Sequence, residues 1–174
     1  MNERTKSMVR CALFAALLAV CSQLAIPLPM ISINLALFAV HLAGAVLGPR
    51  YGTASVLVYI ALGICGVPVF LGFQAGPAVL FGKTGGYILG YILDALIVGL
   101  WSRRVGDSLP QLCLGMAAGV AVCYAFGTAW FMALTHTGLW ASLTYCVLPF
   151  LPGDAVKIAL AAIVTRALAR RAFV

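Results

Sequence analysis

The sequence has few charged side chains and almost no acidic ones. Asp, Glu, Lys and Arg make up 9% of its 174 residues, and only four residues are acidic. Hydrophobic residues make up 64% of the chain and the mean hydropathy is +1.10, which excludes an ordinary soluble domain. A chain of this length has room for about six spans of about 20 residues. The sequence therefore predicts one all-α membrane bundle over 1–174, with no second domain.

Motifs for metal binding, catalysis and nucleotide binding are also missing. The six cysteines form no C-x-x-C pair and mostly lie in apolar runs, where they are expected to be small buried hydrophobic residues. Gly82-Lys83-Thr84 is similar to the end of a P-loop, but that motif needs glycine where the chain has Pro77. The net charge of +7 is not gathered on a basic face that would bind nucleic acid. We expect no metal, no cofactor, no catalytic residue and no nucleic-acid partner.

Apolar runs alternate with glycine, proline and polar connections along the whole chain. They predict six helices, at residues 11–26, 33–48, 52–71, 87–101, 111–134 and 154–169. Residues 135–148 are expected to form a loop. Within that loop, His136, Trp140 and Tyr145 are interpreted as membrane-interface residues, with a lid over a site as the alternative.

Positive charges are distributed unevenly between the runs. With six spans and both termini in the cytoplasm, nine of the eleven Lys and Arg residues lie inside: Arg4, Lys6, Arg10, Arg50, Arg103, Arg104, Arg166, Arg170 and Arg171. An excess of Lys and Arg on the inner side is typical of multi-pass proteins, so we expect this orientation in a bacterial-type plasma membrane. It places 72–86 and 149–157 on the same outer face. Irregular backbone at membrane depth is tolerated where it lines a cavity or is buried in protein.

The segment 149–157 combines helix-breaking residues with two of the few charges away from the chain ends and loops. Pro152 and Gly153 are expected to end the preceding element, with Asp154 as the N-cap of the last helix and Lys157 one turn later. Charge near a bilayer core is costly, so this pair is a candidate functional site. The alternative is a structural pair, in which Asp154 caps the helix and Lys157 neutralises it.

The first run, 11–26, is interpreted as a retained helix, with a signal peptide cleaved before Cys21 as the alternative. It contains two small-x-x-x-small pairs, which allow another helix to approach closely. That neighbour is either a helix of the same bundle or one of another membrane subunit. The two pairs are Ala12 with Ala16 and Ala15 with Ala19.

Two polar residues inside predicted helices have no assigned role. His41 is interpreted as a packed or pore-facing histidine rather than a metal ligand. Asp94 is expected to bond to a neighbouring helix, although it shares a helical face with Tyr87 and Tyr91.

Five short motifs occur in order along nearly the whole chain. They are Ile26-Pro27-Leu28-Pro29, Leu47-Gly48-Pro49-Arg50-Tyr51-Gly52, Gly66-Val67-Pro68-Val69-Phe70, Gly82-x-Thr84-Gly85-Gly86-Tyr87 and Pro149-Phe150-x-Pro152-Gly153-Asp154-x-x-Lys157. Together they resemble the BioY family, the biotin-specific substrate-binding (S) components of energy-coupling factor transporters. The last two motifs together are specific, while each alone is weak.

The resemblance implies a six-helix S-component fold that binds biotin from the outer side with high affinity. It also implies a membrane-lipid environment and three partner subunits, a transmembrane coupling protein and two cytoplasmic ATPases. In S components an Ala-x-x-x-Ala pattern on the first helix docks to the coupling protein, which Ala12/Ala16 or Ala15/Ala19 matches here. The chain departs from the family at Lys83, where proline is usual, and in the segment 30–36, which lacks the usual threonine and glutamine.

Biotin has a carboxylate, a ureido group with two N–H donors and one C=O acceptor, and an apolar thioether ring. Lys157 is expected to bind the carboxylate and Asp154 to accept a ureido N–H, with the reverse assignment as an alternative. Amide side chains add donors and acceptors, aromatic rings supply the apolar wall, and glycines let the backbone approach. The candidate binding residues are Asp154, Lys157, Gln74, Tyr87, Gly85, Gly86, Asn34 and Phe73.

Two other functions remain as alternatives. An S component for another vitamin such as thiamine would need a different set of contacts. A small membrane enzyme would use Asp154 and Lys157 as acid and base, but the sequence offers no nucleophile or electrophile beside them.

Overall fold

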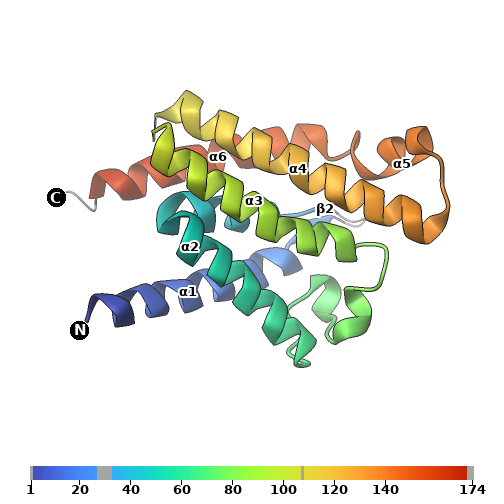
Figure 1. The fold of residues 1–174 in the computed structure, drawn as a ribbon, viewed down its shortest axis with the longest axis horizontal. Helices are drawn as coiled ribbons and strands as arrows, with labels where there is room; N and C mark the ends of the chain where they lie inside the picture. Colours follow the sequence, from blue (N-terminus) through green and yellow to red (C-terminus); the bar gives the residue numbers. More distant parts are fainter. Residues whose placement is uncertain (1, 27–32, 107, 172–174) are drawn as a thin grey trace.

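The structure, a computed structural model, describes residues 2–26, 33–106 and 108–171. These residues form a helical bundle with one short pair of strands (Figure 1). The helices are α1 (Glu3–Gln23), α2 (Ala36–Ile64), α3 (Gly85–Arg104), α4 (Leu109–Thr135), α5 (Leu139–Cys146) and α6 (Leu151–Arg171). Strands β1 (Ala25–Ile26) and β2 (Ile33–Asn34) pair antiparallel, and the 3-10 turns η1 (Leu71–Phe73) and η2 (Pro77–Val79) lie between α2 and α3. The predicted motif at 26–29 lies mostly outside the described residues.

Helix α2 is broken at Gly48 into two arms, residues 36–47 and 49–64. Gly48 has a φ of +79°, a conformation that glycine adopts at little steric cost, and the following Pro49 suits the first turn of the second arm. A Cβ on Gly52 would lie 2.5 Å from the carbonyl oxygen of Ala43. In a continuous helix these two positions would be about 13 Å apart. The arms therefore fold back on each other, and they correspond to the two helices predicted at 33–48 and 52–71. The second arm ends at Ile64, however, so residues 65–71, which were predicted to be helical, belong to the loop that follows.

The helices are apolar enough for a membrane protein. By length and hydropathy α1, α2, α3 and α4 can each cross a membrane, and α5 with α6, bent by 51°, form a fifth candidate span. The predicted six spans correspond to these five candidates with α2 counted as two arms. The first arm is only about 18 Å long at 1.5 Å per residue, which is shorter than a bilayer core of about 30 Å.

Two local predictions near the end of the chain were wrong. The segment 135–148, expected to be a loop, contains the two-turn helix α5. Helix α6 begins at Leu151 rather than at position 154, so Asp154 lies in its first turn and is not its N-cap. The Asp154 N–H already donates to the Phe150 carbonyl oxygen at 2.8 Å. Pro152 does not break the helix, because N–H groups in a first turn have no intrahelical acceptor.

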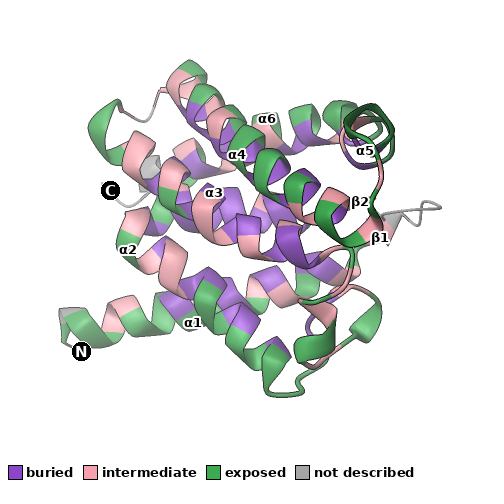
Figure 2. Ribbon diagram, turned by 45° about the vertical axis from the view of Figure 1, so that its right-hand side comes forward, coloured by how far each residue is buried: buried purple, intermediate pink, exposed green. Residues whose placement is uncertain are grey.

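The helices pack in sequence order, and the last one closes the bundle. Helix α2 packs on α1 and α3, α3 packs on α4, and α6 packs against both α2 and α4. Buried residues face the centre of the bundle, while large apolar side chains such as Leu13, Leu57 and Leu114 are exposed on its outside (Figure 2). An outer surface of this kind is suited to lipid.

Helices α3 and α4 fit together through reciprocal pairs of glycine and aromatic residues. On α3, Gly86 lies directly against the Trp130 side chain of α4. On α4, Gly127 lies directly against the Tyr87 ring of α3. An added methyl group at either glycine would overlap the facing ring, so each ring occupies space that only glycine leaves. Small residues at helix contacts are typical of membrane bundles, because packing rather than water exclusion holds the helices together.

The bundle has two different ends. The start of α1, the end of α6, the end of α3 and the break in α2 lie at one end, and α5, β2 and the loop between α2 and α3 lie at the other (Figure 1). Arg103 and Arg104 in the last turn of α3, and Arg50 beside the break, therefore belong to the end that carries both termini. The positive charges gather at one end of the fold, as their order in the sequence predicted.

Candidate ligand-binding site

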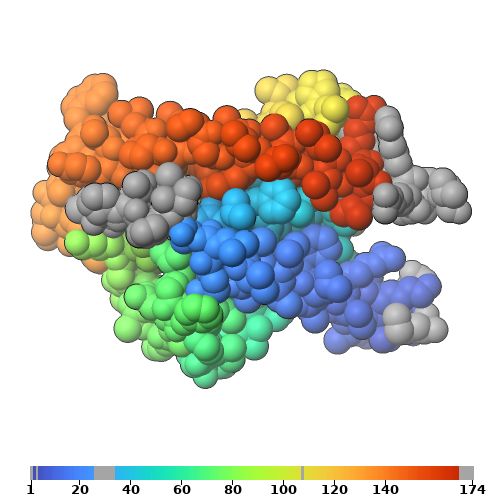
Figure 3. Space-filling view, turned by 180° about the vertical axis from the view of Figure 1, so that it is seen from behind, coloured from blue at the N-terminus to red at the C-terminus, as the bar shows by residue number. Residues whose placement is uncertain are grey.

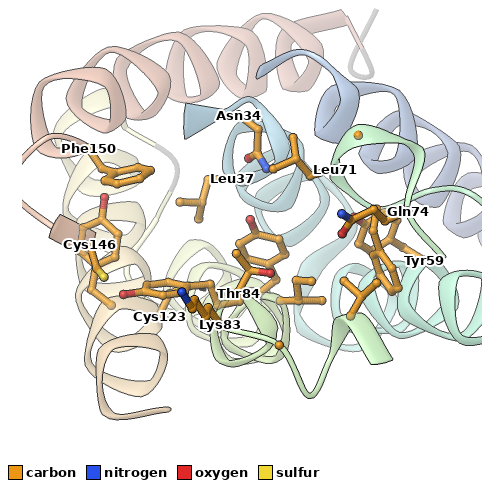
Figure 4. Close-up of a pocket in the computed structure, with 18 of the residues that line it drawn as sticks. Asn34, Leu37, Tyr59, Leu71, Gln74, Lys83, Thr84, Cys123, Cys146 and Phe150 are labelled. Carbon is orange, nitrogen blue, oxygen red and sulfur yellow. Dashed lines mark hydrogen bonds between the residues drawn. The ribbon is translucent and has the colours of Figure 1, made fainter. Parts of the chain in front are cut away.

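The end opposite the termini contains a cavity of about 880 Å³. Its wall is formed by α2, α3, α4, the start of α6 and the loop between α2 and α3 (Figure 4). This volume lies within the range of about 300–1,000 Å³ that is usual for small-molecule sites. The lining is mostly apolar and aromatic with a few polar groups, which is the usual composition of such a site.

The loop over one side of the cavity is tied to the end of α1. Gln23 donates from Nε2 to the carbonyl oxygens of Val69 and Phe70, at 3.0 and 2.9 Å, and its Oε1 accepts from the Phe73 N–H at 3.0 Å. The Ser22 hydroxyl donates to the Val69 carbonyl oxygen at 2.5 Å. These bonds hold a segment whose own regular structure is limited to the one-turn η1 and a single β-bridge between Phe70 and Gln74. Phe70, which the segment carries, is buried in the cavity wall.

The charged centre of the cavity is the pair formed by Asp154 and Lys157. Lys157 Nζ donates to Asp154 Oδ1 at 2.7 Å, and the side chains are 6% and 3% exposed for the lysine and the aspartate. The hydroxyl of Tyr124 donates to the other carboxylate oxygen, Oδ2. Asp154 therefore has one partner on each oxygen, while the described part of the chain offers an acceptor to only one of the three ammonium donors of Lys157.

Aromatic rings form much of the remaining wall. Tyr59 and Phe70 meet edge to face with ring centres 5.6 Å apart, and Tyr87 and Tyr124 do the same at 6.5 Å. Edge-to-face pairs of this kind stabilise a fixed arrangement of the rings. The Tyr87 hydroxyl is also within 3.1 Å of Thr128 Oγ1. The wall is therefore preformed, with flat apolar surface available to a ring-shaped ligand.

Two amide side chains reach the cavity from different elements. Asn34 lies just before α2, and its Oδ1 accepts from the Ala36 N–H at 3.1 Å. Its amide nitrogen interacts with the Tyr91 side chain and, with two N–H groups, can still donate toward the cavity. Gln74 follows η1, is exposed, and retains both its donor and its acceptor. Figure 4 shows Asn34 and Gln74 on different sides of the cavity.

Five of the eight predicted binding residues line the cavity: Asp154, Lys157, Gln74, Tyr87 and Asn34. The other three do not. Phe73 is 72% exposed. Gly85 packs on the Leu80 carbonyl and Gly86 on Trp130, so the close approach expected at these glycines is made to the protein itself. In the structure these two glycines shape the loop and the α3–α4 contact, and their contact with a ligand stays a prediction.

Sequence reasoning missed several lining residues. Tyr59, Tyr91, Tyr124 and Phe150 lie within or beside apolar runs, where one aromatic residue cannot be distinguished from another. Tyr91 did carry a weak signal, because it shares a helical face with Tyr87.

His41 and Asp94 form a second buried polar pair, between α2 and α3. His41 Nε2 on α2 lies 3.2 Å from Asp94 Oδ2 on α3, and both side chains are completely buried. The structure thus agrees with the expectation that Asp94 contacts a neighbouring helix. No group of three or more possible metal ligands occurs in the described ranges 2–26, 33–106 and 108–171.

Comparison with known proteins identifies the family. The sequence profile of the BioY family matches residues 1–173. The chain belongs to the BioY family. A Thermotoga maritima protein named biotin transporter BioY is 34% identical over 159 residues, which cover 91% of this chain and 93% of the relative. A Pyrococcus horikoshii protein named probable biotin transporter BioY is 36% identical over 165 residues, covering 95% and 97%.

The fold of this BioY-family chain also matches a solved structure. That structure is described as the S-component for biotin from an ECF-type ABC transporter. The TM-score is 0.91 at 27% sequence identity, and the match covers 98% of this chain and 95% of the other. The bundle described above is therefore an S-component fold, as the sequence motifs predicted.

Proposed function

We propose that this protein binds biotin in the cavity and takes it up across the plasma membrane as the S component of an energy-coupling factor transporter. On this proposal it is a transporter subunit and not an enzyme. The observation that carries the proposal is a preformed cavity with a buried Asp154–Lys157 pair, in a chain of the BioY family. Buried charges inside a membrane bundle are costly, and they are typical of substrate sites.

The polar groups around Asp154 match the ureido end of biotin. Lys157 has donors left for the ureido oxygen, and each Asp154 oxygen retains a lone pair for a ureido N–H. The amide nitrogen of Asn34 adds a further donor. The tyrosine rings then cover the apolar thioether ring. In this arrangement the ureido group replaces water around a pair that is already assembled, so little reorganisation is needed.

Titration of labelled biotin onto the purified protein in detergent tests the proposal. We expect saturable, tight binding, and no comparable binding of thiamine. Asp154→Asn should weaken binding, because it removes the charge while keeping the shape. Arg104→Gln, at the opposite end of the bundle, is the matched control and should leave binding unchanged. Saturable binding of thiamine with none of biotin would refute the proposal.

The proposed partners are a transmembrane coupling protein and two cytoplasmic ATPases, and the docking face is on α1. Ala12 and Ala16 are exposed, and neighbouring Leu13 is 62% exposed. Ala15 is 1% exposed and packs in the core. Figure 3 shows α1 (blue) lying along the surface of the molecule, with part of α2 (cyan) between it and α6 (red). Of the two predicted alanine pairs, only Ala12/Ala16 is available to a partner, whereas Ala15/Ala19 packs within the bundle.

The proposed orientation places both termini in the cytoplasm and the cavity toward the outside. The positive charges at the terminal end of the bundle support it, because cytoplasmic segments of membrane proteins are enriched in Lys and Arg. The same orientation opens the cavity toward external biotin.

A further inference from the structure

Three charged side chains line the cavity: Asp154, Lys157 and Lys83. The first two form an ion pair and cancel each other. Lys83 has no ion pair or hydrogen bond of its side chain with any residue in the described ranges 2–26, 33–106 and 108–171. With one aspartate and two lysines, the lining has a formal charge of +1, and the unbalanced charge is that of Lys83. A lining of this charge suits a ligand with a single negative charge.

Lys83 lies at a different depth from the buried pair. It is exposed, whereas the side chains of Lys157 and Asp154 are only 6% and 3% exposed. Figure 4 shows Lys83 beside Thr84 on one side of the cavity, with Asn34 on the far side. An exposed lysine that also lines the cavity must be at its mouth.

The backbone on which Lys83 sits is held in place. The carbonyl oxygen of Gly82 accepts from Trp130 Nε1 on α4 and from the Gly85 N–H, both at 3.1 Å. Gly85 in turn packs closely on the Leu80 carbonyl. The turn is therefore held on both sides of Lys83, which fixes the point from which its flexible side chain extends.

We propose that Lys83, and not Lys157, binds the carboxylate of the ligand. This rests on the proposed function, since it assigns the carboxylate end of biotin. A carboxylate placed on Lys157 would lie close to Asp154, and two carboxylates that share a buried site repel each other. Lys83 has no acidic neighbour of this kind in the lining and remains near water, so the carboxylate loses little hydration there. The ring system therefore enters first, and the carboxylate stays at the mouth.

The test measures two ligands, biotin and the uncharged biotin amide, on the full-length protein in detergent. For Lys83→Gln we expect biotin to bind about two- to fivefold more weakly, the range for an exposed ion pair, while biotin amide is unaffected. Lys83→Arg keeps the charge and should retain biotin binding. The difference between biotin and its amide on wild type should shrink with added salt, because exposed charges are screened. Arg104→Gln, which removes an exposed cation at the far end of α3, is the control and should change neither ligand.

Several results would overturn the inference. Equal losses of biotin and biotin amide in Lys83→Gln would mean that Lys83 acts on the loop rather than on the carboxylate. If Lys83→Gln weakens the binding of neither ligand, Lys83 does not bind the carboxylate and the inference fails. If Lys157→Ala discriminates biotin from its amide and Lys83→Gln does not, the carboxylate lies on Lys157. A wild-type protein that binds neither ligand would instead refute the proposed function, and the inference with it.

Discussion

Removing both members of the Asp154–Lys157 pair should destabilise the protein by much less than the sum of the two single losses. The charges lie 2.7 Å apart with almost no exposure. At an effective dielectric constant of about 20, two unit charges at this distance attract by about 6 kcal/mol. Part of that attraction offsets the cost of taking both groups out of water. Loss of one partner from a buried pair typically costs about 3–5 kcal/mol, because the other charge is left buried alone.

We therefore expect Asp154→Asn and Lys157→Met each to lower the free energy of unfolding by about 3 kcal/mol or more. The double variant Asp154→Asn/Lys157→Met should lose less than the sum of the two by at least about 2 kcal/mol. Tyr124→Phe is the matched control for the neighbouring hydrogen bond. It removes one donor to Asp154 and should cost only about 1.5–3 kcal/mol.

The assay is denaturant-induced unfolding of each purified variant in the same detergent without biotin. Additive losses in the double variant would show that the two charges do not stabilise each other, and the electrostatic reasoning would fail. Biotin titration on the same samples separates structure from binding. If the double variant binds biotin no more weakly than either single variant, the pair supports the fold and the ligand contacts lie elsewhere in the cavity.

Three other predictions follow from the outside of the bundle and from its helix contacts. Ala16→Trp on the exposed face of α1 should leave biotin binding intact and abolish ATP-driven uptake. The same change at buried Ala15 should instead destabilise the protein by about 1–3 kcal/mol through overpacking. Intact uptake in Ala16→Trp would reject the docking face. A cysteine introduced at position 104 should react with an impermeant maleimide only in permeabilised cells, and native exposed Cys65 should react in intact cells; the reverse pattern would invert the orientation. Gly127→Ala should lower the thermal stability of the protein, because the added methyl group overlaps the Tyr87 ring. Gly138→Ala is the control and should not lower it, because nothing lies within 4 Å of a Cβ at that position. Equal losses of thermal stability in the two variants would contradict the packing argument.

The sequence predicted the polar part of the site better than its apolar part. Asp154, Lys157, Gln74 and Asn34 stand out because polar residues are rare in this chain, and all four line the cavity. Tyr124 gave no comparable signal, because its role depends on the position of α6 relative to α4. That position is a tertiary contact, and no local pattern encodes it.

The differences between the prediction and the structure have physical causes. Pro152 and Gly153 are poor residues for a helix interior, but a first turn tolerates both, so α6 starts earlier than expected. The glycines at 85 and 86 do mark a close approach of the backbone, yet the approaching groups are a carbonyl and an indole of the same chain. A glycine in a sequence reveals that space is needed and does not reveal what fills it.

The interlocked contact between α3 and α4 determines where the sequence can change. In lipid an exposed Leu, Ile, Val or Phe can replace another at little cost, because the surrounding hydrocarbon adapts to each shape. Gly86 and Gly127 have no such freedom, since each faces a ring that would have to leave before a methyl group could enter. Replacement of Trp130 by a smaller residue would in turn leave a void beside Gly86. In a mutational scan of these helices, the smallest and largest residues should therefore be the least replaceable, and the ordinary aliphatic residues on the outside the most interchangeable.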